Sequence, residues 1–184
     1  MLTQSELLDK NLNAPNFVLL NTDNKYYSLK DIKGSKGTLI CFICNHCPYV
    51  KAVIHKIVKD TQELKKYGIG SVAIMSNDID SYPEDSFENM IKFSKDNNFS
   101  IPYLYDETQN IAKSYKAVCT PDFFGFDKNL RLQFRGRIDS SGFHNKENVE
   151  RELFNSMIAV SNNIKIPFNN PSIGCSIKWK QNAG

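Results

Sequence analysis

Apolar residues in the first half of the chain follow two spacings, one typical of a buried strand and one typical of an amphipathic helix. Residues 38–43 are apolar on both alternating faces, as in a central strand of a parallel sheet that helices cover on both sides. Between Val50 and Leu64, apolar residues recur at positions i, i+3, i+4 and i+7, while the opposite face is polar. Gly68 ends this helix, and residues 71–76 predict the next strand. The pattern therefore predicts a βαβ unit.

The same spacings predict further elements on both sides of this unit. Strands are expected at 16–20 and 103–105, helices at 86–97, 108–115 and 147–162, and a hairpin at 123–126 and 130–138. Because these elements alternate along the chain without repeats or linkers, we expect an α/β fold in one domain.

We divide this expected single domain, residues 1–184, into three parts. Residues 1–36 are an N-terminal extension, residues 37–163 the core, and residues 164–184 a C-terminal tail. Ile173, Ile177 and Trp179 are apolar residues within the tail. They predict that the tail packs on the body of the domain.

The composition fits this picture. The chain has 184 residues, 41% hydrophobic and 23% charged, which is typical of a globular domain with a sizeable core. The net charge is +3, without the basic stripe that binds nucleic acid. No apolar run is long enough to span a bilayer, and residues 1–10 lack the apolar stretch of a signal peptide. We therefore expect a cytoplasmic protein without nucleic-acid or membrane partners.

Five cysteines change the picture more than the charge does: Cys41, Cys44, Cys47, Cys119 and Cys175. An odd number in a chain expected to be cytoplasmic argues against a disulfide framework and favours reactive, buried or metal-bound thiols. Cys41, in the middle of an apolar strand, is predicted to be an inert core residue. Cys119 lies either in the core or at the edge of a site. Cys175 is either a third redox thiol or buried under Trp179.

Cys44 and Cys47 lie three residues apart at the junction of the strand and the helix. This spacing allows a disulfide with little backbone movement, and the N–H groups and dipole at the helix start favour a thiolate, which we assign to Cys44. Cys47, one turn further in, then attacks the mixed disulfide and releases the partner. His46, when protonated, further favours the Cys44 thiolate. Pro48 suits a first helical turn because it lacks an N–H.

The same pair also supplies half of a zinc site, which needs two further ligands at matching spacing. Apart from Cys41 and Cys44, which overlap the pair within the predicted strand, the sequence holds no further C-x-x-C and no H-x-x-x-H pattern. A redox pair is therefore the better interpretation, and we predict neither a bound metal nor a cofactor.

The chain resembles the thioredoxin superfamily over residues 16–160, through C-N-H-C-P at residues 44–48 and through Thr120 and Pro121. The resemblance implies a thioredoxin fold, with a central mixed β-sheet flanked by helices on both faces. It also implies a cis bond before Pro121 in a loop that faces the cysteine pair. Backbone groups of Thr120 would dock a substrate strand, and Pro121 would keep metals from competing for the thiols.

Other stretches resemble a narrower group. Residues 103–115, Y-L-Y-D-E-T-Q-N-I-A-K-S-Y, are similar to the peroxiredoxin or redoxin branch. The combination of F-I-C-N-H-C-P-Y-V, R-G-R-I-D and G-C-S-I-K-W is similar to the bacterial peroxiredoxin-like proteins, which are AhpC/TSA-related redoxins.

Better-known members of the superfamily differ from the chain at positions that define their chemistry. The peroxiredoxin pattern P-x-x-x-[T/S]-x-x-C does not match, whether it is aligned on Cys44 or on Cys47. Thioredoxins usually have Trp just before the first cysteine and a buried Asp six residues ahead of it, where this chain has Ile43 and Thr38. The usual proton acceptor for the second thiol is therefore missing.

Three functions are compatible with these features. The leading hypothesis is a thiol–disulfide oxidoreductase that acts on protein or small-molecule disulfides, with a thiol reductant as electron donor. The alternative is a thiol-dependent peroxidase, an antioxidant in which Arg137 stabilises the departing oxygen and Cys175 or the other cysteine of the pair resolves the sulfenate. The third is a copper or zinc carrier that uses the pair together with His144.

Overall fold

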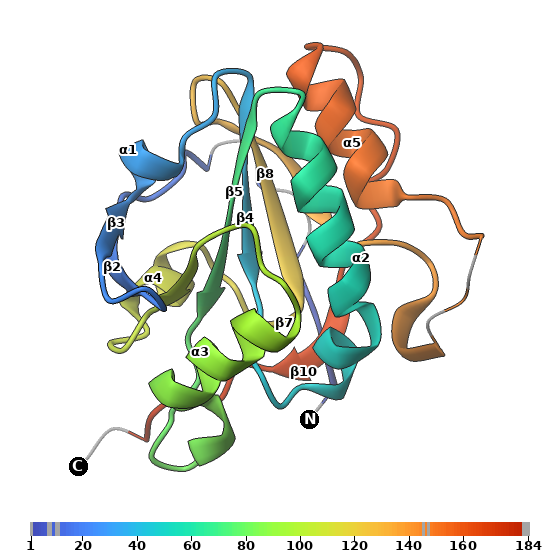
Figure 1. Cartoon of the computed structure of the whole chain (residues 1–184). Coiled ribbons are helices and arrows are strands. Elements are labelled where there is room, and N and C mark those ends of the chain that lie inside the picture. The colour runs from blue at the N-terminus through green and yellow to red at the C-terminus, as the bar shows by residue number, and fades with distance from the viewer. Residues whose placement is uncertain (1, 7–8, 10–11, 145, 147, 182–184) are drawn as a thin grey trace.

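The computed structural model describes residues 2–6, 9, 12–144, 146 and 148–181. Within them, seven strands form one sheet in the order β3-β2-β6-β5-β4-β8-β9, and three form a second in the order β1-β10-β7 (Figure 1). The strands are β1 Leu2–Gln4, β2 Val18–Asn21, β3 Tyr26–Ser28, β4 Gly37–Phe42, β5 Ile69–Met75, β6 Tyr103–Tyr105, β7 Cys119–Thr120, β8 Asp122–Asp127, β9 Leu132–Gly136 and β10 Ile173–Ser176. The α-helices are α1 Leu29–Ile32, α2 Pro48–Lys65, α3 Phe87–Asp96, α4 Asn110–Ser114 and α5 Glu152–Ser161, and the 3₁₀ turns are η1 Pro83–Asp85 and η2 Gly142–His144.

The central strand β4 is buried along its whole length because helices cover both faces of the sheet. Leu39 and Cys41 pack in a cluster with side chains of α2, α3 and α5, whereas Ile40 and Phe42 pack in a second cluster with α1 and α4. Strand β4 is parallel to β5 and antiparallel to β8. The expected mixed sheet with helices on both faces is thus confirmed.

Most of the predicted elements are confirmed with small shifts at their ends, and α5 differs most. A helix was expected at residues 147–162, but α5 begins at Glu152. Asn148 has a φ of 56°, which is not helical, and the Arg151 guanidinium binds Asp60 of α2 at 2.6 Å. Residues 148–151 therefore form a loop, and Glu147 lies outside the described residues.

Both ends of the chain join sheets. Strands β2 and β3, from the predicted N-terminal extension, form one edge of the large sheet. The tail packs on the body through β10, which pairs with β7 and β1, and through Ile177, which is buried. Trp179 is 39% exposed and its ring lies under the Lys113 ammonium, so it does not bury Cys175 as one interpretation of the tail required.

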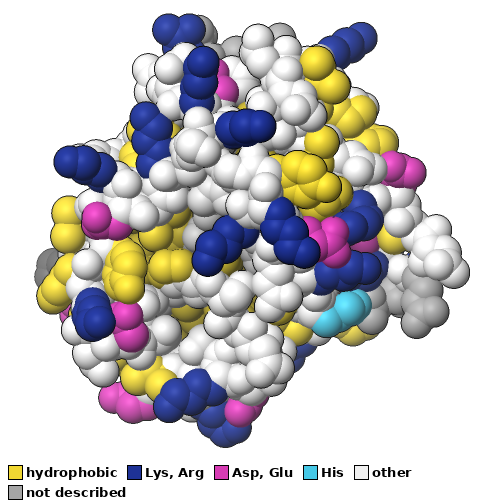
Figure 2. Space-filling model, turned by 45° about the horizontal axis from the view of Figure 1, so that its top comes forward, with side chains coloured by type: hydrophobic (Ala, Val, Ile, Leu, Met, Phe, Trp, Pro, Cys, Tyr) yellow, Lys and Arg dark blue, Asp and Glu magenta, His cyan; other side chains and the backbone are white. Residues whose placement is uncertain are grey.

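The surface carries both charge signs. On the face shown in Figure 2, Lys and Arg side chains are scattered among acidic and hydrophobic ones. None of the helices in the described part of the chain combines the length and the hydrophobicity that crossing a membrane requires.

Candidate active site

The cysteine pair lies where β4 ends and α2 begins, next to β7 and β10 (Figure 1). Pro48 occupies the first turn of α2, as expected, and Cys47 is the N-cap residue. The Cys47 side chain makes no capping hydrogen bond to the first turn. Cys47 is therefore the cysteine at the helix start, where Cys44 was expected. The reason is that the helix begins only at Pro48, one residue after the motif's second cysteine.

Thr120 lies against both sulfurs. In its protonated form the Cys47 thiol donates a hydrogen bond to the Thr120 carbonyl oxygen at 3.3 Å, and the Cys44 sulfur lies 3.5 Å from the Thr120 hydroxyl oxygen. The Thr120–Pro121 bond is cis, as the resemblance implied. The loop with the cis bond thus faces the cysteine pair.

The two thiols have opposite pKa shifts. The interaction with Cys44 lowers the pKa of Cys47, although burial acts to raise it. The pKa of Cys44 is raised well above its ordinary value by the hydrogen bond with Cys47, by burial, and by the nearby Asp85 carboxylate. These opposite shifts favour the thiolate at Cys47 over Cys44, and the roles of the two thiols stay predictions.

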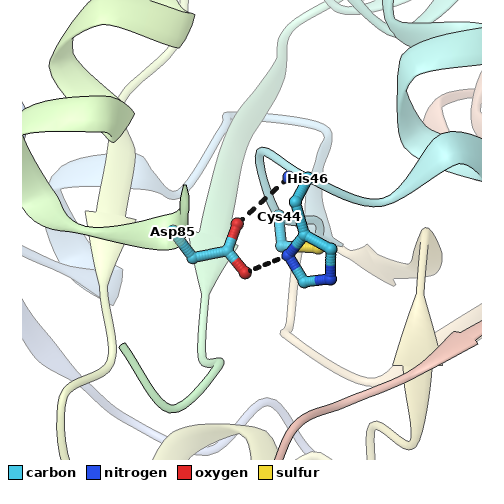
Figure 3. Close-up of side chains that lie close together, drawn as sticks. All are labelled: Cys44, His46 and Asp85. Atoms are coloured by element: carbon cyan, nitrogen blue, oxygen red, sulfur yellow. Dashed lines mark hydrogen bonds and ion pairs between the residues drawn. The ribbon is translucent and has the colours of Figure 1, made fainter. Parts of the chain in front are cut away.

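A buried carboxylate, that of Asp85 in η1, lies beside the motif and is hydrogen-bonded to it (Figure 3). Its Oδ1 accepts the backbone N–H groups of Asn45 at 2.8 Å and His46 at 3.1 Å. Its Oδ2 lies 2.6 Å from His46 Nδ1 and accepts the Asn77 side-chain amide at 2.7 Å. Asp85 therefore fixes both the backbone of the C-N-H-C segment and the orientation of the His46 ring.

The sequence analysis missed Asp85 and Asn77. Both follow β5, which is parallel to β4, so the loops after the two strands meet at the same edge of the sheet. An acidic residue shortly after a predicted parallel strand was the available signal. One Asp85 oxygen, one His46 ring nitrogen and the Cys44 sulfur lie within 4.8 Å of one another.

The same three atoms would be the start of a metal site, but their chemistry fits one poorly. Asp85 already makes four hydrogen bonds, one of them with Nδ1 of His46. His144, the further ligand considered for a metal carrier, is an exposed residue of η2 and is not in this cluster.

Arg137, proposed for a peroxidase, binds a carboxylate instead of the cysteine pair. Its guanidinium donates to both Glu152 oxygens, from Nε at 3.0 Å and from Nη2 at 2.7 Å. It lines a cavity of about 330 Å³ together with Pro121. The structure thus places Arg137 near the cis bond with its charge already paired.

The remaining cysteines lie in two different environments. Cys41 and Cys119 are fully buried, and burial raises the pKa of both thiols, so neither is an accessible nucleophile. Cys175 of β10 is partly exposed and lies directly opposite Thr120 in the antiparallel pairing with β7.

The His46–Asp85 interaction predicts a pH-dependent stability. Asp85 raises the pKa of His46 above 6.5, so this contribution is complete below that pH and is lost as the pH rises through the raised value. Burial acts to raise the pKa of Asp85, but its hydrogen bonds outweigh this and lower it below 3.8, so its contribution is lost only in strong acid. We expect His46→Gln to cost about 1 kcal/mol more at about pH 5.5 than at about pH 9 in urea unfolding.

His55→Gln is the matched control, because His55 is exposed on the polar face of α2. An equal loss for His46→Gln at both pH values would contradict the assignment of this ion pair.

Fold and site together define a redoxin of the thioredoxin superfamily, with a C-x-x-C pair facing a cis-proline loop. The chain belongs to the AhpC/TSA family, whose model matches residues 11–135. It is 25% identical over 153 residues to the thiol-disulfide oxidoreductase ResA of Bacillus thuringiensis subsp. konkukian (strain 97-27), an alignment that covers 82% of this chain and 80% of that protein.

Solved structures agree with this assignment. An uncharacterized conserved protein from Geobacillus kaustophilus is 43% identical and superposes with a TM-score of 0.94, covering 100% of this chain and 98% of that one. The thioredoxin domain of a thiol-disulfide oxidoreductase from Bacteroides vulgatus is 18% identical, with a TM-score of 0.58 over 70% of this chain and 91% of that one. The thioredoxin fold is therefore confirmed, and the narrower peroxiredoxin-like group stays a prediction.

Proposed function

We propose that the protein is a thiol–disulfide oxidoreductase in which Cys44 and Cys47 alternate between dithiol and disulfide. The observation that carries this proposal is the geometry at Thr120, whose carbonyl and hydroxyl oxygens lie 3.3 and 3.5 Å from the two sulfurs beside a cis bond. The relationship to a thiol-disulfide oxidoreductase supports it. Arg137 is paired with Glu152, so no observation favours peroxide reduction over disulfide exchange.

In this mechanism Cys47 attacks and Cys44 resolves. The Cys47 thiolate attacks one sulfur of an incoming disulfide, forms a mixed disulfide and releases the first substrate thiolate, which takes a proton. Cys44 then gives up its proton and attacks the Cys47 sulfur, which forms the Cys44–Cys47 disulfide and releases the second thiol. Electrons pass from the protein dithiol to the substrate disulfide, and an external thiol reductant returns them.

Asp85 and His46 would assist the second step. Cys44 must lose a proton when it attacks, and its sulfur lies within 4.8 Å of an Asp85 oxygen and a His46 ring nitrogen. The Asp85–His46 pair is therefore placed to accept this proton. Protein or small-molecule disulfides are the substrate class that we propose, because the bond that breaks and the bond that forms in each step are both disulfide bonds.

Disulfide mapping in glutathione buffers tests this function. As the fraction of oxidised glutathione rises, we expect a disulfide to form within the tryptic peptide of residues 37–51, and insulin reduction to depend on it. Cys44→Ser should abolish both, whereas Cys41→Ala, in the same peptide, should leave both intact. Full insulin-reducing activity in Cys44→Ser would rule the mechanism out.

A further inference from the structure

The tail strand β10 occupies the edge of the strand that carries the cis bond. It pairs antiparallel with β7, with Cys175 opposite Thr120 and Ser176 opposite Cys119. The resemblance implied that the backbone of Thr120 pairs with a substrate strand. In the structure it pairs instead with β10, a strand of the chain itself. This register brings a third thiol to the residue that contacts both sulfurs of the pair.

The approach of β10 to the cis bond depends on a glycine. A Cβ atom at Gly174 would lie 2.0 Å from the Thr120 carbonyl oxygen and 3.2 Å from the Pro121 nitrogen, so a side chain at this position would push β10 away. The tail is also fixed beyond β10, where the Lys178 N–H donates to the Asn77 side chain at 2.9 Å. Backbone contacts before and after Cys175 therefore fix its position.

Cys175 lies beside the pair. It packs against the core cluster that contains Cys44 and Cys47, and it is the register partner of Thr120, which lies against both sulfurs. Burial and the Cys47 thiolate raise the pKa of Cys175 to about 11. When Cys47 is bound in a disulfide, its charge is absent, and Lys178 then acts to lower the pKa of Cys175.

The pair itself is closed to solvent. Cys44 and Cys47 are 1% and 0% exposed. Of the five cysteines, all of which lie in the described residues, Cys175 alone is partly exposed. An external thiol or disulfide therefore meets Cys175 before it meets the pair.

We propose that Cys175 is a third redox cysteine, which relays disulfide exchange between the buried pair and external thiols. This inference rests on the proposed function and identifies the thiol that meets the external partner. The disulfide that Cys47 attacks is then a mixed disulfide already formed on Cys175.

The oxidised pair returns to the dithiol by a series of thiol–disulfide exchange steps. The Cys175 thiolate attacks the Cys47 sulfur of the Cys44–Cys47 disulfide, and Cys44 leaves and takes up the proton that Cys175 lost. An external thiolate then attacks the partly exposed Cys175 sulfur, and Cys47 leaves as a thiolate. Cys47 suits this role because a thiol of low pKa leaves fastest. A second external thiol resolves the mixed disulfide on Cys175, and the reverse steps carry oxidation inward.

Disulfide mapping in the full chain tests the first contact. Cys44→Ser treated with oxidised glutathione should join the tryptic peptides of residues 37–51 and 166–178 through Cys47 and Cys175, and Cys47→Ser should not. A stable glutathione adduct on Cys47 in Cys44→Ser, without this cross-link, would overturn the relay.

Reduction kinetics separate the relay from the proposed function. We expect the Cys44–Cys47 disulfide of Cys175→Ser to form but to be reduced by glutathione about tenfold more slowly or worse, with Cys41→Ala as the thiol-removal control. A wild-type rate in Cys175→Ser would refute the relay and leave the proposed function standing. Failure of the wild type to form the Cys44–Cys47 disulfide would refute the proposed function.

A second variant keeps every thiol. Gly174→Ala should displace β10 from Thr120 and slow reduction about as much as Cys175→Ser, whereas Ile173→Ala, on the exposed neighbouring residue, should not. Circular dichroism confirms that each variant is folded. A folded Gly174→Ala protein with an unchanged Cys47–Cys175 cross-link and an unchanged rate of reduction would contradict the proposed position of Cys175.

Discussion

Cys47→Ser is expected to lower the rate of insulin reduction by about a thousandfold or more, because a serine hydroxyl does not attack sulfur at neutral pH. Cys47 is the attacking residue in the proposed mechanism, and it is the N-cap residue of α2. Stopped-flow or turbidity measurements of insulin reduction check this expectation. A Cys47→Ser protein that retained most of its activity would assign the attack to another thiol.

The pH dependence of alkylation tests the same residue independently. Iodoacetamide reacts with the thiolate, so labelling of Cys47, which is slow because the sulfur is buried, should reach its plateau at a lower pH than labelling of an ordinary thiol. An ordinary thiol rises only near its usual value of 9.0. Mass spectrometry after brief labelling gives the rate at each cysteine. A midpoint near 9 would show that the thiolate is not stabilised at Cys47.

Asp122→Asn is expected to lower the free energy of unfolding by about 3–5 kcal/mol, because it leaves a buried charge without its partner. The Arg135 guanidinium donates to Asp122 at 3.0 Å, and the two side chains are 2% and 0% exposed. Arg135 also stacks on the Phe124 ring at 4.6 Å, so it has no route to solvent. Glu6, its other acidic neighbour at 3.8 Å, is mostly exposed and compensates weakly. Urea unfolding measures the loss.

Two variants control this measurement. Lys92→Ala breaks an ion pair whose side chains are 71% and 57% exposed, and should change stability by about 0–1 kcal/mol. A double variant, Asp122→Leu with Arg135→Met, removes both buried charges and should regain much of the stability lost in Asp122→Asn. Equal losses for the buried and the exposed pair would refute the assigned role of Asp122.

The secondary structure of the core was largely predictable, because each element shows its environment in its own sequence. Alternation marks β4 as buried on both faces, and the helical spacing after it marks the inner face of α2. The start of α5 was not predictable in this way. It depends on the positive φ of Asn148 and on the ion pair between Arg151 and α2, which are set by residues distant in sequence.

The candidate site was predictable only in part. The cis bond before Pro121 was expected from the resemblance and is present in the structure. Asp85 was missed, because an acidic residue after a strand is a weak signal until the parallel pairing of β4 and β5 brings its loop to the motif. Cys175 remained open between two interpretations, since its place depends on the register between β10 and β7.

By itself, the sequence determined a βαβ unit with a cysteine pair at its strand–helix junction, because spacing and helix-end chemistry are local properties. Tertiary structure alone decided which groups surround the pair. The pKa of a thiol depends on nearby hydrogen bonds and charges, and Thr120, Asp85 and Cys175 come to the pair from three other segments of the chain. Groups so far apart in the chain converge on the pair only when the sheets and the tail are in place.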